Sequence, residues 1–265
     1  MMRKVILQCL CVFVAVAGGV LLQLHPDLAA QAAQLVQRAA EKNLVLAVGH
    51  VERFNPVLRY LEEVATDPRF IESHRLSPYP ARSMDIGVVL DLMIHDLDVV
   101  LGFVHSPLAS VDAVGIPVLS RSEDMANARL RFANGCVANL TASRVSPEKM
   151  RKIRVCTMTS YVSLDYRAQE GFIYRVAREG EEESSLFKKL LRAKDSAIVS
   201  RFGGRRIVRE PVPIEKDEPL KLELQDFIRC ILGHQVPKVS GASAKRALDL
   251  ALEITRQIQT GIPLA

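Results

Sequence analysis

The segment from Asp85 to Val104, DIGVVLDLMIHDLDVVLGFV, constrains the fold more than any other part of the chain. It is too long for one strand, and as a helix it is apolar on almost every side. The exceptions recur at helical steps of four, four, three and four residues, and they are Gly87, Asp91, His95, Asp98 and Gly102. We therefore expect a buried helix that carries one narrow stripe of small and ionisable residues.

This stripe is a candidate active site, because a buried ionisable side chain needs either a partner or a wet cavity. Asp91 and His95 are four residues apart, so they can form a hydrogen bond on one helix face. Such a bond predicts a raised imidazole pKa and a fixed ring, as a general acid–base needs near neutral pH. The alternative is structural, in which Asp91, His95 and Asp98 cap strand ends or pair with an arginine on a neighbouring element.

A second group of polar residues lies in VGHVERFNP, residues 48–56, directly after an apolar run typical of a buried parallel strand. Ligands of open α/β sheets bind beyond the carboxyl ends of the strands. Arg53 would there hold an anionic or hydroxylated substrate, and His50 would face the same crevice. The alternative is a histidine satisfied within its loop and an Arg53 paired with Glu52 or Glu62.

Periodicity divides the remaining chain into helices and short strands. Helical spacing predicts helices over residues 27–42, 56–65, 220–232 and 243–260. Strand patterns cover residues 44–48, 71–76, 109–118, 126–132, 136–143, 153–157, 161–166, 171–176 and 206–214. Asn134-Gly135 predicts a hairpin turn, and the polar stretch 179–209 predicts a surface excursion. The order of elements favours an α/β segment followed by an antiparallel sheet.

Composition excludes several classes of protein. With 265 residues, 49% hydrophobic and 25% charged, the chain is too apolar for disorder and forms one or two globular domains. The net charge of +5 has no single-sign block, and the basic runs 149–154 and 201–209 hold a single aromatic residue, Phe202, which argues against nucleic-acid binding through stacked bases. Five scattered cysteines without a C-x-x-C pair predict neither disulfides nor a metal site, which favours a cytoplasmic location.

The N-terminal residues leave the cellular location of the protein open. Arg3 and Lys4 precede an apolar run over residues 5–22, which resembles a signal peptide or a short membrane anchor. The run is at the lower length limit for a spanning helix and is followed by no convincing cleavage site. The competing interpretation, which we favour, is a strand fragment of an α/β domain in a cytoplasmic protein without a membrane partner.

Four stretches resemble one known family. VGHVERFNP, GVVLDLMIHDLDVVLGF, YVSLDY at 161–166 and VSGASAKRALDLALEI at 239–254 are similar to the Gfo/Idh/MocA oxidoreductases. The nucleotide-sugar members, such as UDP-N-acetylglucosamine 3-dehydrogenases, look nearest. The resemblance runs from about residue 29 to the end of the chain, and its D-x-x-x-H spacing is specific.

The resemblance implies the fold and the domain organisation. Residues 1–54 would be the C-terminal end of a Rossmann NAD(P)-binding domain, a remnant of an α/β fold. Residues 55–265 would form an α+β domain with a large, mostly antiparallel open sheet that serves substrate binding and oligomerisation. The last helix, 243–260, would pack back on the Rossmann part, and the chain would form a homo-oligomer through the open sheet.

The resemblance also implies the chemistry. His95 would exchange a proton with a sugar hydroxyl while hydride passes to or from NAD or NADP, with Asp91 orienting the ring. Arg53, His50 and Asp98 would contact the substrate or the cofactor. The substrate would be a sugar or a nucleotide sugar, oxidised at a hydroxyl carbon.

Two family motifs are missing from the sequence. No glycine-rich G-x-G-x-x-G turn occurs, so no residue is assigned to the cofactor phosphates. Leu24-His25-Pro26 stands where the family has E-K-P, whose lysine assists the proton transfer. An alternative function follows: a cofactor-free remnant, or a binding or oligomerisation module, from a truncated or frameshifted gene.

Overall fold

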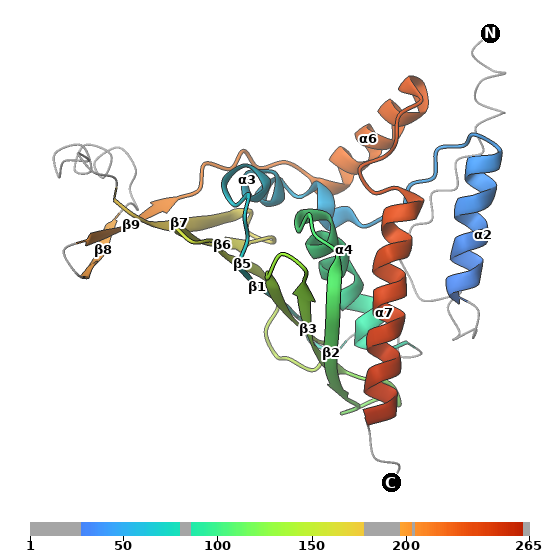
Figure 1. Cartoon of the computed structure of the whole chain (residues 1–265), viewed down its shortest axis with the longest axis horizontal. Helices are drawn as coiled ribbons and strands as arrows, with labels where there is room; N and C mark the ends of the chain where they lie inside the picture. The colour runs from blue at the N-terminus through green and yellow to red at the C-terminus, as the bar shows by residue number, and fades with distance from the viewer. Residues whose placement is uncertain (1–27, 80–85, 178–196, 203–204, 262–265) are drawn as a thin grey trace.

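The computed structural model describes residues 28–79, 86–177, 197–202 and 205–261 (Figure 1). These residues form one nine-stranded sheet in the order β2-β3-β4-β1-β5-β6-β7-β9-β8. The strands are β1 (Phe70–Leu76), β2 (Leu108–Ile116), β3 (Met125–Phe132), β4 (Val137–Ser143), β5 (Met150–Cys156), β6 (Ser160–Asp165), β7 (Glu170–Val176), β8 (Ala197–Phe202) and β9 (Arg205–Pro211). The helices are α2 (Leu28–Glu41), η1 (Val51–Phe54), α3 (Pro56–Val64), η2 (Val89–Met93), α4 (Ile94–Phe103), α6 (Pro219–Gly233) and α7 (Gly241–Gly261).

The sheet is mixed. Strands β1 and β4 run parallel at its centre, with Phe70 opposite Val137 and Leu76 opposite Ser143, and the other neighbours are antiparallel. Parallel pairing needs a long crossover, and the chain supplies one through η2, α4, β2 and β3 between the two strands. The expectation of a mostly antiparallel sheet is therefore corrected to a mixed sheet.

The predicted hairpin at Asn134-Gly135 is confirmed. It joins β3 to β4, and Gly135 has a φ of 83°, a left-handed backbone conformation that residues with a side chain adopt only at a cost in free energy. The backbone N–H of Phe132 donates to the carbonyl of Cys136 at 2.9 Å, and Gly135 N–H donates to Phe132 at 2.9 Å. The turn thus sets the register between β3 and β4.

The four helices predicted from periodicity are confirmed as α2, α3, α6 and α7. Helix α3 begins as the sequence indicates, with Pro56 in its first turn and the Asn55 side chain accepting from the N–H of Val57 at 3.3 Å. Helices α4 and α7 pack together over the β2 to β4 end of the sheet, α7 also packs on α2, and α3 lies against β6 (Figure 1). The main hydrophobic core fills the space between these helices and the sheet.

The predicted strand at residues 44–48 is wrong. Within the described residues this segment is extended, and it makes only an isolated bridge between Ala47 and Ser240. Among the residues that the structure describes, no parallel strand lies beside it to form a ladder, so apolar character alone does not make a strand. The described residues therefore do not show the expected Rossmann remnant, and the boundary between residues 54 and 55 stays a prediction.

Part of the polar stretch 179–209 was also interpreted wrongly as a surface excursion. Strand β8 and the first residues of β9 belong to the sheet. Their β-branched residues, in AIVSRF and RRIVREP, favour strands despite the surrounding charge. The N-terminal run 5–22 and His25 lie outside the described residues, and no helix of the described part is long and apolar enough to span a membrane.

Candidate active site

The predicted helix at residues 85–104 begins, within the described residues, with a π-helical turn, η2, that continues into α4. π-helical turns are rare and are frequent at functional sites. Asp91 lies half-buried in this turn, four residues before His95. The helix is buried as expected, with its widened turn at the first ionisable residue of the stripe.

The glycines of the stripe make room for charged side chains from other elements. A Cβ at Gly102 would overlap the guanidinium of Arg53, and a Cβ at Gly87 would overlap the carboxylate of Glu123. Glu123 also accepts from the N–H of Val89 at 3.3 Å, which holds the start of the helix. The small residues at both ends of the stripe are therefore explained by close approach.

Asp98 joins the two predicted contact residues, His50 and Arg53. Its Oδ2 lies 3.4 Å from His50 Nδ1 and 3.4 Å from Arg53 Nη1, and Arg53 Nη1 also donates to the Asp98 backbone carbonyl at 3.0 Å. All three side chains are buried. The His50 ring in turn meets the His95 ring edge to face, with centroids 5.4 Å apart. The structure thus brings His50, Arg53, His95 and Asp98 together.

A buried ion network that sequence reasoning missed supports this cluster. Arg75, on β1, donates from Nε to Asp96 Oδ2 at 2.6 Å and from Nη1 to Glu52 Oε1 at 3.2 Å. Burial disfavours the charge on Arg75, but the two carboxylates outweigh it and raise its pKa. Arg151, at the exposed rim, also donates to Glu52 Oε1 at 3.1 Å. The only local signal for this network was the third acidic residue, Asp96, next to the stripe.

His95 has a pKa lowered to about 3, first by burial and then by the positive charge of Arg75 and by the neighbouring His50. Its Nδ1 has no hydrogen-bond partner among the described residues. The expectation that Asp91 raises this pKa is therefore wrong in direction, since burial and neighbouring cations outweigh a carboxylate one turn away. His95 is a neutral imidazole at pH 7, and the roles predicted for it and for Asp91 stay predictions.

Helix α6 adds an acid that the sequence analysis did not single out. Glu223 is 4% exposed, and its Oε1 has no hydrogen-bond partner among the described residues. Burial raises its pKa to about 7, while the nearby His50 acts in the opposite direction. Tyr166 OH is a further unpartnered buried atom, and burial holds its pKa well above the usual value. Buried polar atoms without partners are uncommon and mark this region as a site.

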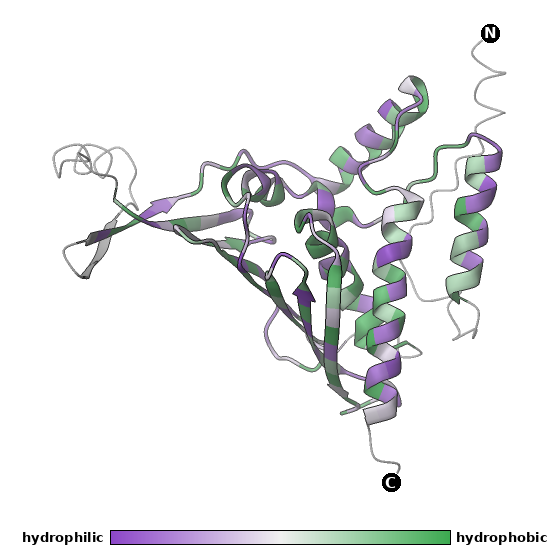
Figure 2. Cartoon of the chain, in the orientation of Figure 1, coloured by the Kyte–Doolittle hydropathy of each residue, from purple (hydrophilic) through white to green (hydrophobic). Residues whose placement is uncertain are grey.

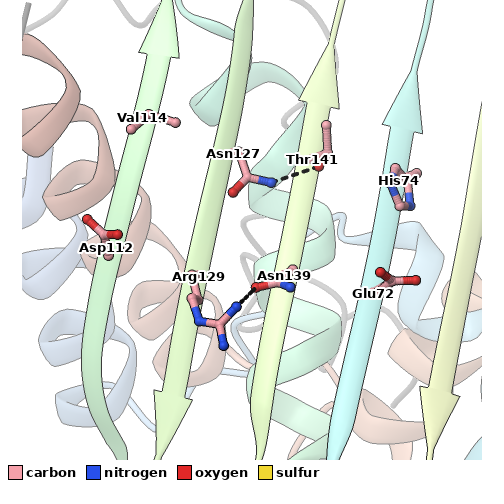
Figure 3. A pocket seen from close by; sticks show the side chains of 8 residues that line it. All are labelled: Glu72, His74, Asp112, Val114, Asn127, Arg129, Asn139 and Thr141. Carbon is pink, nitrogen blue, oxygen red and sulfur yellow. Dashed lines mark hydrogen bonds between the residues drawn. The ribbon is translucent and has the colours of Figure 1, made fainter.

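A second, polar hollow of about 330 Å³ lies on the sheet (Figure 3). Its residues come from β1 to β4 and point away from the helices, which lie behind the strands in the figure. They are Glu72, His74, Asp112, Val114, Asn127, Arg129, Asn139 and Thr141. Asn127 donates to Thr141 at 2.9 Å and Arg129 to Asn139 at 3.3 Å, so four of the eight lining residues are hydrogen-bonded to one another.

Comparisons with known proteins show which family the chain resembles. Residues 64–160 match the model of the GFO/IDH/MocA C-terminal domain. The UDP-N-acetylglucosamine 3-dehydrogenase of Acidithiobacillus ferrooxidans is 34% identical over 225 residues, which cover 84% of this chain and 66% of that protein. A solved structure of that dehydrogenase aligns with a TM-score of 0.75 at 33% identity, over 88% of this chain and 68% of the other.

A more distant structure shares the fold. An NAD-binding protein from Listeria innocua is 16% identical and aligns with a TM-score of 0.66, over 88% of this chain and 70% of that one. At this identity the likeness concerns the fold alone. This chain spans about two thirds of the length of each of these relatives.

Proposed function

The chain belongs to the Gfo/Idh/MocA family of oxidoreductases, and from this premise we propose that it takes part in the oxidation or reduction of a nucleotide sugar at a hydroxyl carbon. The observation that carries the proposal is the neutral, half-buried His95 beside the buried His50, Asp98 and Arg53. A base must be unprotonated before it accepts a proton, and His95 is unprotonated at pH 7.

In this proposal each residue has one task. His95 takes the proton from the sugar hydroxyl in the oxidative direction and returns it in the reductive one. Asp98 orients His50 and Arg53, and Arg53 contacts the substrate or the cofactor. Asp91, one turn before His95, orients the helix end that carries the imidazole. Water is kept out by the surrounding burial, which strengthens each of these interactions.

The cofactor we propose is NAD or NADP, whose nicotinamide, when bound, supplies the acceptor or donor of hydride. The residues fit the reacting end of such a group, because the buried Nδ1 of His95 and the buried hydroxyl of Tyr166 have no hydrogen-bond partner among the described residues. The pyrophosphate of such a cofactor is usually bound by a G-x-G-x-x-G turn, and this motif does not occur in the sequence. We therefore assign no residue of this chain to the phosphates.

Ligand binding tests the proposal directly. The full chain is titrated with UDP-N-acetylglucosamine, with and without NADH, while its melting temperature is followed, because a ligand that binds the native state must raise it. We expect a saturable increase that Arg53→Ala weakens and that the exposed-site control Arg256→Ala leaves unchanged. Absence of any increase up to millimolar sugar and cofactor would reject a nucleotide-sugar site on this chain.

A second function, an oligomerisation module, is favoured by the outward-facing strand surface (Figure 3). Val114 and Ile116 of β2 are 65% and 54% exposed beside the polar hollow. We propose that this surface pairs with a second copy of the chain. Sedimentation of Val114→Arg should then show a loss of oligomer, whereas Leu232→Arg, on α6, should leave it intact. Identical sedimentation of Val114→Arg and the unmodified chain would exclude this surface.

A further inference from the structure

Arg151 is an exposed cation at the edge of the candidate active site. It lies on β5 opposite Arg75 of β1, and its Nη1 donates to Glu52 Oε1 at 3.1 Å. Its side chain is 53% exposed, whereas the side chains of Arg75 and Glu52 are 5% and 7% exposed. The Arg151 side chain therefore connects the buried ion network with solvent.

A short series of contacts joins Arg151 to His95. Glu52 Oε1 also accepts from Arg75 at 3.2 Å, and Arg75 donates to Asp96 Oδ2 at 2.6 Å. Asp96 directly follows His95 in α4. The charge of Arg151 acts on the same imidazole, because burial and then Arg75 lower the pKa of His95 and Arg151 lowers it further. Arg151 and His95 therefore belong to one site, with Arg151 on its solvent side.

The guanidinium of Arg151 has hydrogen-bond donors to spare. An arginine carries five N–H donors in a planar fork. Glu52 takes one of them at Nη1, and no other hydrogen bond or ion pair of the Arg151 side chain occurs among the residues that the structure describes. The Nε–Nη2 edge of such a fork matches two oxygens of a carboxylate or a phosphate. Arg151 can therefore keep Glu52 and bind an anion from solvent at the same time.

Two other arginines of the site are held by buried carboxylates. Arg53 donates to the carbonyl and the carboxylate of Asp98, and Arg75 donates from Nε and Nη2 to Asp96. Both arginines are buried, on η1 and β1. Figure 2 shows hydrophilic residues among the hydrophobic ones where η1 and α4 pack together. The anionic part of a ligand that arrives from solvent therefore meets Arg151 before it meets these two.

These observations assign a ligand group to Arg151. We propose that the Nε–Nη2 edge of Arg151 binds the diphosphate of the nucleotide sugar while the sugar lies at His95. Arg151 contacts the ligand away from the reacting carbon, so it is a binding residue and not a catalytic one. The inference rests on the proposed function, which supplies the nucleotide sugar. The pyrophosphate of NAD or NADP carries the same chemistry, and the test below separates the two sources.

Isothermal titration calorimetry of the full chain tests the contact with UDP-N-acetylglucosamine, UDP and NADH as separate probes. A hydrogen bond to a charged group is worth about tenfold in affinity, so Arg151→Gln should weaken binding of both uridine nucleotides by about that factor. Any binding of NADH should stay unchanged. Arg151→Lys, which keeps the charge but not the planar fork, should show a smaller loss. Arg154→Gln is the matched control, because Arg154 lies on the other face of the same strand, paired with Glu72 at 3.5 Å, and it should bind like the unmodified chain.

Two results would overturn the proposal. One is an Arg151→Gln variant that binds UDP-N-acetylglucosamine as tightly as the unmodified chain does. The other is a loss of affinity confined to NADH, which would assign Arg151 to the cofactor. Should Arg151→Gln fail to fold, Arg151→Lys decides, and an unchanged affinity of that variant for UDP-N-acetylglucosamine refutes the contact.

The UDP probe separates this inference from the proposed function. UDP binding that requires Arg151, in a chain that does not bind the nucleotide sugar, would retain the diphosphate contact and reject the function. Nucleotide-sugar binding that is independent of Arg151 would retain the function and reject the contact. Absence of binding for both uridine nucleotides would reject both proposals.

Discussion

Replacing Gly102 by alanine tests whether this glycine exists to admit Arg53. The added Cβ would overlap the guanidinium group. Arg53 is only 9% exposed and donates both to the backbone carbonyl and to the carboxylate of Asp98. It cannot give way without losing both contacts, and Asp98 would then be left buried without its cation.

The expected change in the free energy of unfolding is the difference between two opposing effects. Alanine in a helix is more favourable than glycine by at most about 1 kcal/mol. Removing one partner from a buried ion pair costs about 3–5 kcal/mol. Gly102→Ala should therefore lower the free energy of unfolding by about 2–4 kcal/mol, the reverse of what helix propensity alone predicts.

Urea unfolding measures this value in two backgrounds. In the unmodified chain we expect the loss just derived. In the Arg53→Ala background the obstacle is gone, so Gly102→Ala should be neutral or stabilise by up to about 1 kcal/mol. Gly261→Ala, in α7, is the control, since no atom lies within 4 Å of its added Cβ. An equal loss in both backgrounds would refute the steric argument.

Three further predictions concern the site and its scaffold. The pKa of His95 is held at about 3, below its unfolded value of 6.5, so the free energy of unfolding should fall by on the order of a few kcal/mol as pH falls from about 6.5 toward 3. Unfolding curves measured at several pH values should show this loss in the unmodified chain and not in His95→Gln. The same pH dependence in both proteins would contradict the prediction. Arg75→Leu leaves the Asp96 carboxylate buried and unpaired and should destabilise by about 3–5 kcal/mol in urea, with partial recovery in the double variant that also carries Asp96→Leu. Gly135→Ala, at a φ of 83°, should cost about 1–2 kcal/mol and lower the melting temperature; an unchanged value would show that the turn relaxes.

The parts of the fold that sequence analysis predicted depend on local patterns. The β3–β4 hairpin follows from Asn134-Gly135, and α3 follows from Asn55-Pro56, because each signal and its consequence lie within a few residues. Residues 44–48 were misinterpreted because a buried strand and a buried extended segment share the same apolar run. Only the segments that lie beside the run in the fold decide between them, and here Ala47 forms a single isolated bridge to Ser240.

The candidate site, too, was predictable only where its signal lies within one element. The stripe was predictable because its spacing lies within one helix, and it led to His95 and Asp98. The direction of the His95 pKa shift was not predictable, because the positive charge of Arg75 arrives from β1, twenty residues away in sequence. Electrostatic interactions between residues so far apart in the sequence leave no repeating pattern from which they could be predicted.

Glu223 shows where a local rule gives the opposite answer. An amphipathic helix is expected to bury its leucines, and by that rule residues 220, 224, 228 and 232 would face the core. The structure buries Glu223 instead and leaves those side chains exposed. A helix with two possible inward sides is oriented by the elements it packs against, and α6 packs on η1. Which side of an amphipathic helix faces inward therefore depends on contacts with elements far away in the sequence, and the spacing of its leucines alone does not predict it.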